Sequence, residues 1–144
     1  MDRKNIDWSN LGFSYLETDK RFVANYKNGA WDEGVFSDNA MITMSECACV
    51  LQYAQTCFEG LKAYTTVDGK IVCFRPDLNA ARMADSCRRM RMPVFPEERF
   101  VEAVVETVRA NKEWVPPYGS GASLYLRPFM FGSDSIIGVK PATE

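Results

Sequence analysis

Alternating apolar and polar positions predict β-strands in several parts of this chain. The clearest pair lies on either side of the Asp-Gly dipeptide at 68–69. Such a dipeptide suits a tight hairpin turn because both of its positions tolerate positive φ. An Asn-Gly dipeptide at 28–29 gives the same signal after an earlier apolar segment. The segments expected to form strands are 20–26, 58–66, 70–74 and 123–131.

Helical periodicity marks two longer segments between the predicted strands 70–74 and 123–131. The segment 96–111 opens with a proline and two acidic residues, which favour the positive end of a helix, and its valines form one apolar stripe. The segment 76–91 also opens with a proline, which is harmless in a first helical turn, and Pro93 stops it. A shorter helix is expected over 45–55, with Ser45 as its N-cap.

Together these elements predict an α+β fold, with a mostly antiparallel sheet and two or three helices packed on one side. The 144 residues suit one domain with a single core, preceded by a polar arm over 1–12. Apolar residues make up 47% of the chain, which fits a packed globular domain. No stretch reaches the roughly 20 apolar residues that a membrane span requires.

Charge and cysteine content narrow the expected partners and location. A net charge of −2 argues against nucleic acid or an anionic membrane as a partner. The five cysteines are an odd number, and no apolar run follows the first residues, so we expect no signal peptide. Reduced thiols in a cytoplasmic protein are the simplest account. The chain contains no histidine, and a metal site is not expected.

Arg82 is a candidate anion ligand on the predicted helix 76–91, where several arginines make a locally positive element. A guanidinium binds phosphate at two points, and its charge does not titrate away. The ordinary alternative is an arginine on a solvated helix face. The residues alone leave both interpretations open.

Tyr125 and Arg127 are a second candidate pair. They point to one face of the predicted strand 123–131, since side chains alternate along a strand. A phenol and a guanidinium on one face bind a carboxylate by charge and hydrogen bond together. The alternative is a structural arginine that pairs with an acid at the edge of the core.

Glu59 and Gly60 lie inside a predicted strand, where a glycine indicates close approach by a ligand or another backbone. Glu59 suits a general acid or base, although an ion pair with Lys62 or an arginine is the commoner role. Three aromatic residues would line an apolar pocket or belong to the core: Phe13, Tyr53 and Phe58.

Three motifs follow one another in a fixed order: Phe-Glu-Gly-Leu-Lys-Ala-Tyr at 58–64, Phe-Arg-Pro-Asp-Leu-Asn-Ala-Ala-Arg-Met at 74–83, and Ser-Leu-Tyr-Leu-Arg-Pro at 123–128. Together they resemble the small N-terminal domain of branched-chain amino-acid aminotransferases, which are pyridoxal-phosphate enzymes of fold type IV. The resemblance covers nearly the whole chain. Two departures lie within the chain: Gln52 stands where the family has a histidine, and 132–136 lacks the family's Glu-Pro pair.

The resemblance implies a role for each candidate residue. Arg82 would bind the phosphate of pyridoxal 5′-phosphate. Tyr125 and Arg127 would hold the substrate α-carboxylate, or the second carboxylate of the amino acceptor. The residues that would form the slot for a branched side chain are Phe13, Tyr53 and Phe58. In a homodimer, Tyr53 and the loop that carries Ile137 and Val139 would reach the neighbouring subunit's pocket.

The implied reaction is transfer of the amino group of leucine, isoleucine or valine to 2-oxoglutarate, giving 2-oxo acids and glutamate, as in branched-chain amino-acid biosynthesis. The lysine that anchors the cofactor in this family lies in a second, C-terminal domain, which is absent from this chain. We therefore assign no catalytic residue here and expect these 144 residues alone to be inactive. The alternatives are a D-amino-acid aminotransferase or aminodeoxychorismate lyase of the same fold type, or a non-catalytic interaction domain.

Overall fold

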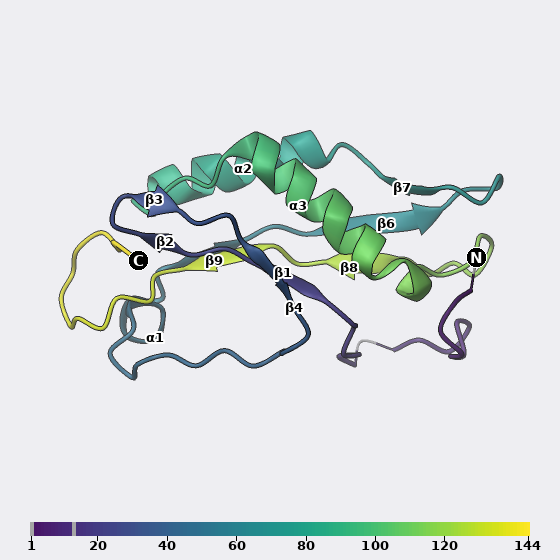
Figure 1. The fold of residues 1–144 in the computed structure, drawn as a ribbon, viewed down its shortest axis with the longest axis horizontal. Helices are drawn as coiled ribbons and strands as arrows, with labels where there is room; N and C mark the ends of the chain where they lie inside the picture. Colours follow the sequence, from purple (N-terminus) through teal and green to yellow (C-terminus); the bar gives the residue numbers. More distant parts are fainter. Residues whose placement is uncertain (1, 13) are drawn as a thin grey trace.

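The computed structural model describes residues 2–12 and 14–144, and it places two long helices along one side of a set of short antiparallel strands (Figure 1). The predicted α+β architecture is confirmed, and both long helices lie where they were expected. The helices are α1 (Cys49–Tyr53), α2 (Pro76–Arg89), α3 (Glu97–Ala110) and a 3₁₀ turn (Lys112–Trp114). The strands are β1 (Arg21–Val23), β2 (Tyr26–Lys27), β3 (Ala30–Trp31), β4 (Val35–Ser37), β5 (Thr56–Phe58), β6 (Leu61–Thr65), β7 (Ile71–Cys73), β8 (Leu124–Leu126) and β9 (Phe129–Phe131).

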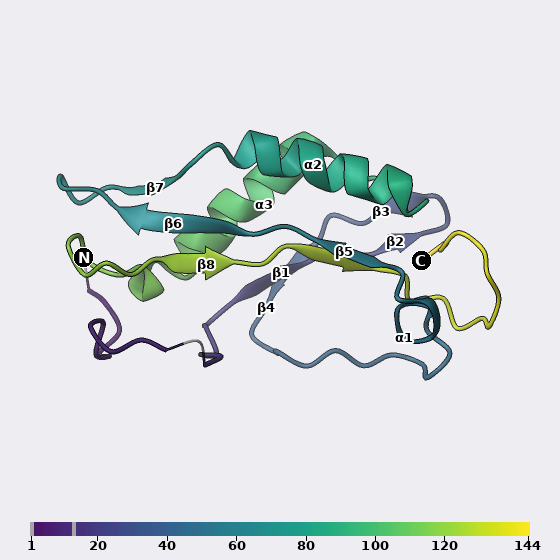
Figure 2. The ribbon, with the colours of Figure 1, turned by 180° about the vertical axis from the view of Figure 1, so that it is seen from behind.

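The central feature is a long antiparallel ladder in which β5 pairs with β9 and β6 pairs with β8 (Figure 2). Both pairings share one register, which puts Glu59 opposite Pro128 between the paired segments. The Glu59 amide donates to the Pro128 carbonyl at 2.8 Å, but proline has no amide hydrogen to return. Each predicted strand, 58–66 and 123–131, is therefore present as two short strands rather than one.

The two predicted turns are confirmed. β6 and β7 form an antiparallel hairpin around the Asp-Gly dipeptide, with Gly69 at φ +81°. β2 and β3 pair around the Asn-Gly dipeptide, whose residues have φ +53° and +83°. The predicted strand 20–26 is divided between β1 and β2, and β1 pairs with β4, which was not among the predicted strands.

The first helix differs most from its prediction. It spans five residues rather than the expected 45–55, and its N-cap is Ala48. Ser45 does not cap it, because the Ser45 hydroxyl accepts a hydrogen bond from the Cys47 amide at 3.1 Å and forms a local turn instead. At its other end Ala54 adopts a left-handed conformation, with φ +53°, and the chain turns into β5.

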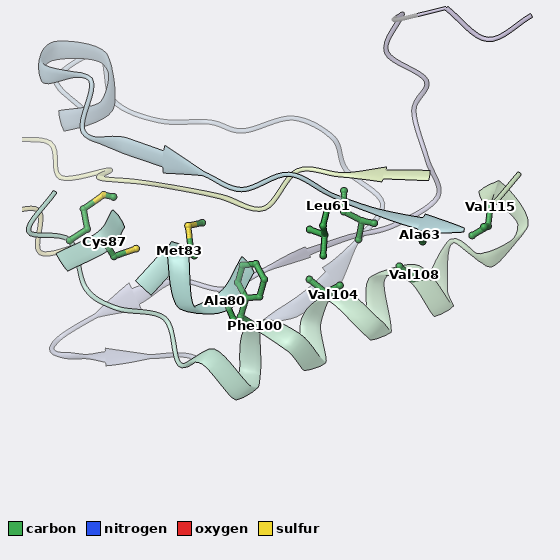
Figure 3. Close-up of a cluster of buried hydrophobic side chains, with 11 residues drawn as sticks. Leu61, Ala63, Ala80, Met83, Cys87, Phe100, Val104, Val108 and Val115 are labelled. Carbon is green, nitrogen blue, oxygen red and sulfur yellow. The ribbon is translucent and has the colours of Figure 1, made fainter. Parts of the chain in front are cut away.

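The hydrophobic core lies between the two long helices and one face of the ladder (Figure 3). Along β6 the inward side chains Leu61 and Ala63 are buried, whereas Lys62 and Tyr64 are exposed on the other face. The predicted apolar stripe of α3 supplies part of this core. The core side chains labelled in Figure 3 are Leu61, Ala63, Ala80, Met83, Cys87, Phe100, Val104, Val108 and Val115. The helices thus cover one face of the ladder, and the other face carries exposed polar and aromatic groups.

The predicted arm 1–12 packs against the domain over its described residues. The Arg3 guanidinium donates to the Val115 carbonyl at 3.0 Å and to the Thr65 hydroxyl at 3.3 Å. The Lys4 amide donates to the Glu113 carbonyl at 3.0 Å. In the part of the chain that the structure describes, no helix has the length and apolar character needed to cross a membrane.

Candidate functional site

A pocket of about 360 Å³ opens where β7 ends and α2 begins. β6, the start of α2, and Tyr125 of β8 contribute to its wall. The polar side chains on this wall are Lys62, Tyr64, Arg75, Asn79, Arg82 and Tyr125. Three of these are cations, so the pocket favours an anionic ligand. A larger cavity, of about 820 Å³, lies by the β2–β3 turn and residues 141–144, and none of the predicted site residues lines it.

Arg82 reaches this pocket while it is held by a buried carboxylate. Its Nε donates to Glu59 Oε1 at 3.1 Å, and its Nη2 donates to Glu59 Oε2 at 2.7 Å. The Glu59 side chain is 10% exposed and the Arg82 side chain is 60% exposed. Of the partners that the sequence left open for Glu59, the structure selects an arginine, Arg82. Arg82 is therefore largely solvated, while one edge of its guanidinium is held by Glu59.

Asn79 completes this cluster from the preceding turn of α2. Its Nδ2 donates to Glu59 Oε2 at 2.8 Å and to the Gly60 carbonyl at 3.2 Å. Burial acts to raise the pKa of Glu59, but the hydrogen bonds from Arg82 and Asn79 and the arginine charge outweigh it and lower that pKa. The bonds to Glu59 also raise the pKa of Arg82. Both groups are therefore charged across the physiological range.

Tyr125 and Arg127 share the exposed face of the ladder, as the strand alternation predicted, with Leu126 buried between them. Arg127 Nε donates to the Tyr125 hydroxyl at 3.0 Å. The Arg127 guanidinium also lies over the Phe58 ring, 4.3 Å from its centroid. A phenol and a guanidinium thus meet at one point, with an aromatic ring beneath the charge.

Gly60 lets Tyr125 cross the neighbouring strand toward the pocket. A Cβ atom at this position would lie 2.4 Å from the Tyr125 hydroxyl oxygen, which is far inside contact distance. The sequence predicted close approach by a ligand or backbone, and the structure finds a side chain instead. The Tyr125 hydroxyl thus lies against Gly60, whose carbonyl accepts a hydrogen bond from Asn79.

The other predicted site residues lie elsewhere. Tyr53 ends α1, while Ile137 and Val139 lie in the segment after β9, and all three are exposed and do not line this pocket. Phe58 is exposed and lies beneath the Arg127 guanidinium. Phe13 lies outside the described residues. Of the predicted site residues, Arg82 and Tyr125 line this pocket, whereas Arg127 and the described residues of the predicted side-chain slot do not.

Two pocket residues were not singled out from the sequence. Asn79 precedes Arg82 by three positions, so both lie on one face of α2, and this spacing could have indicated a shared partner. Arg75 has a left-handed backbone at φ +46°, just before α2, and it pairs with Asp77. The sequence pattern predicts neither the left-handed backbone of Arg75 nor the position of Arg75 on the pocket wall.

A separate sulfur cluster lies within the core. Cys57 Sγ and Cys87 Sγ are 3.8 Å apart, and Cys57 Sγ lies 3.6 Å from Met83 Sδ. Burial raises the pKa of the Cys57 thiol and, together with the neighbouring Cys57, raises that of Cys87 to about 12. Both cysteines are free thiols.

Comparison with known proteins identifies the family to which this arrangement belongs. No model of a protein family matches the chain. Over 141 residues the chain is 52% identical to a branched-chain-amino-acid aminotransferase of Helicobacter pylori and 52% identical to one of Haemophilus influenzae, in each case over 98% of this chain. It spans only 42% and 41% of the length of these relatives.

A solved structure has the same fold. The branched-chain amino acid aminotransferase of Escherichia coli superposes on this chain with a TM-score of 0.63 at 28% identity. The superposition covers 88% of this chain and 36% of that protein. By sequence and by fold, the chain belongs to the branched-chain amino-acid aminotransferase family of fold type IV.

Proposed function

We propose that the protein containing this chain transfers the amino group of leucine, isoleucine or valine to 2-oxoglutarate with pyridoxal 5′-phosphate as cofactor. The observation that carries the proposal is 52% identity, over 98% of the chain, to two relatives named branched-chain-amino-acid aminotransferases. When bound, the cofactor supplies the electron sink that lets an amino group leave one carbon skeleton and join another. The residues of this chain bind and orient its phosphate and the substrate.

The pocket fits the phosphate end of such a cofactor. Arg82 offers a permanent positive charge, and Lys62 and Arg75 line the same wall. Glu59 holds only one edge of the Arg82 guanidinium, through Nε and Nη2. The other edge is available to a phosphate, whose oxygens match a guanidinium at two points. We assign Arg82 as the phosphate ligand on this basis.

Tyr125 and Arg127 suit the substrate carboxylate. Their 3.0 Å hydrogen bond fixes the phenol and the guanidinium relative to each other on the exposed face of the ladder. A carboxylate bound there accepts hydrogen bonds from both groups and is neutralised by Arg127. The same pair serves the α-carboxylate of the amino acid or the second carboxylate of glutamate and 2-oxoglutarate. Phe58, under Arg127, gives this end of the site an apolar wall.

We further infer a homodimer in which Tyr53, Ile137 and Val139 complete the neighbouring subunit's pocket. The three side chains are exposed and lie outside the pocket of their own chain, which supports this role. Phe13 is assigned to the side-chain slot on the family resemblance alone. The lysine that anchors the cofactor is proposed to lie outside these 144 residues, in the part of the protein that the longer relatives contain.

A substrate comparison tests the proposal on the complete protein. Leucine, isoleucine and valine, each with 2-oxoglutarate, should yield glutamate at rates far above those for D-alanine, measured as glutamate formed per enzyme per second. Aminodeoxychorismate should give no product. Preference for D-alanine, or turnover of aminodeoxychorismate, would move the protein to another enzyme of the same fold type. Absence of any transfer with cofactor bound would favour an interaction domain.

A further inference from the structure

The ion pair between Glu59 and Arg82 suggests a function beyond the pairing itself. We propose that Glu59, locked by Asn79, is a positioning residue that turns the free edge of the Arg82 guanidinium toward the pocket and so strengthens binding of a phosphate-bearing ligand. This inference rests on the proposed function, because it takes the phosphate of the cofactor as the ligand. It concerns a carboxylate that would not itself touch the cofactor.

The geometry of the pair leaves a defined donor edge for a ligand. A guanidinium has a side edge, formed by Nε and one Nη, and an end edge, formed by the two Nη atoms. Glu59 accepts from Nε and Nη2, at 3.1 and 2.7 Å, and so occupies the side edge. Among the described residues, none accepts a hydrogen bond from Nη1. The end edge thus keeps parallel N–H groups for two oxygens of one phosphate.

Glu59 is held more firmly by its surroundings than Arg82, the residue that it positions. The Glu59 side chain is only 10% exposed, and its amide is fixed in the ladder by the Pro128 carbonyl. Asn79 grips the same carboxylate at 2.8 Å and ties it to the Gly60 carbonyl. Arg82 is mostly exposed, so without Glu59 its long side chain would sample several rotamers. A ligand would then have to immobilise the side chain on binding, at a cost in affinity.

The negative charge of Glu59 has the opposite effect on phosphate affinity. A carboxylate close to the site repels a phosphate, so removing the negative charge at position 59 would by itself tighten binding. The repulsion is reduced because Glu59 lies behind the guanidinium, on the edge away from the available donors. In Glu59→Gln one oxygen becomes an NH₂ group, which faces an Arg82 donor whichever oxygen it replaces, so the two-point grip on the guanidinium is lost. Positioning and repulsion therefore predict affinity changes of opposite sign.

The test measures dissociation constants of pyridoxal 5′-phosphate and of pyridoxal, which lacks the phosphate, for the cofactor-free form of the complete protein. Glu59→Gln should weaken pyridoxal 5′-phosphate binding about tenfold and pyridoxal binding less than about twofold. Asn79→Ala retains the ion pair and should weaken pyridoxal 5′-phosphate binding about threefold. The matched control is Asp85→Asn, which removes an exposed ion pair with Arg88 on the same helix and should change neither constant.

The outcomes separate this inference from the proposed function. Equal losses for both ligands in Glu59→Gln would indicate a structural role only and overturn the inference. Unchanged or tighter binding of pyridoxal 5′-phosphate to Glu59→Gln would also overturn the inference, because charge repulsion would then dominate. If Glu59→Gln does not fold, Asn79→Ala alone decides by the same comparison. If instead Arg82→Ala binds pyridoxal 5′-phosphate as tightly as the unchanged protein, the phosphate assignment in the proposed function is wrong.

Discussion

Gly60→Ala perturbs the contact by which Tyr125 crosses the ladder. Gly60 does not have positive φ, so alanine fits the backbone and the effect comes from the added methyl group. That group would lie 2.4 Å from the Tyr125 hydroxyl oxygen. Restoring ordinary contact displaces the hydroxyl by about 1 Å. Its 3.0 Å hydrogen bond with Arg127 Nε would then exceed hydrogen-bonding distance.

The expected loss is large for substrate binding and small for folding. A hydrogen bond to a charged group contributes about 1.5–3 kcal/mol, so loss of the fixed Tyr125–Arg127 pair should lower kcat/KM for leucine about 10- to 100-fold. Tyr125 is about half exposed and its ring can rotate into solvent, so the free energy of unfolding should change by less than about 1 kcal/mol. The affinity for pyridoxal 5′-phosphate should stay the same.

The assay combines steady-state kinetics of the complete protein with urea unfolding, and the control is the same substitution in a Tyr125→Phe background. Tyr125→Phe removes the clashing oxygen, and the nearest remaining ring atom is 3.1 Å from the added methyl. In that background Gly60→Ala should lower kcat/KM less than about threefold. A fall as large as in the unchanged protein would refute the reasoning, because the methyl group would then act without the hydroxyl.

Further predictions concern the second anion site, acid stability, thiol reactivity and the core. Arg127→Ala should lower kcat/KM for leucine at least tenfold with little change in cofactor affinity, measured by kinetics and by cofactor titration. Because the pKa of Glu59 is lowered in the folded chain, its ion pair stabilises the fold above the ordinary pKa of 4.5, and this contribution is lost as pH falls through the lower folded pKa. Urea unfolding between about pH 6 and 3 should show this loss in the unchanged protein and a smaller one in Glu59→Gln; identical pH profiles would contradict it. Iodoacetamide at about pH 8, followed by mass spectrometry, should modify the partly exposed Cys47 well before the fully buried Cys87, whose pKa is raised to about 12. Leu61→Ala should destabilise the fold by about 2–5 kcal/mol in urea unfolding, since Leu61 lies at the centre of the core.

Local signals in the sequence predicted the features that depend on neighbouring residues. The Asp-Gly hairpin and the apolar stripe of α3 follow from backbone preference and side-chain period, and both are present. Tyr125 and Arg127 share a face for the same reason, since a strand has a period of two. The interruption at Pro128 also has a local cause, the missing amide hydrogen, although it was not predicted.

Features that depend on distant segments were not predicted. β4 is only three residues long and was not predicted, and it forms by pairing with the predicted strand segment β1. Glu59 and Arg82 are 23 positions apart, and their pairing requires α2 to pack beside the break between β5 and β6. The family resemblance supplied Arg82, Tyr125 and Arg127 as a set. It did not indicate that Glu59 would hold Arg82, or that the Tyr125 hydroxyl would lie against Gly60.

One site is proposed to receive a phosphate at Arg82 and a carboxylate at Tyr125 and Arg127. The most direct measurement is a crystal structure of the complete protein with pyridoxal 5′-phosphate and glutamate bound. We predict a phosphate oxygen within about 3 Å of Arg82 Nη1 and a glutamate carboxylate within about 3 Å of the Tyr125 hydroxyl or the Arg127 guanidinium. A phosphate bound outside this pocket, with Arg82 contacting only Glu59, would contradict the proposed arrangement.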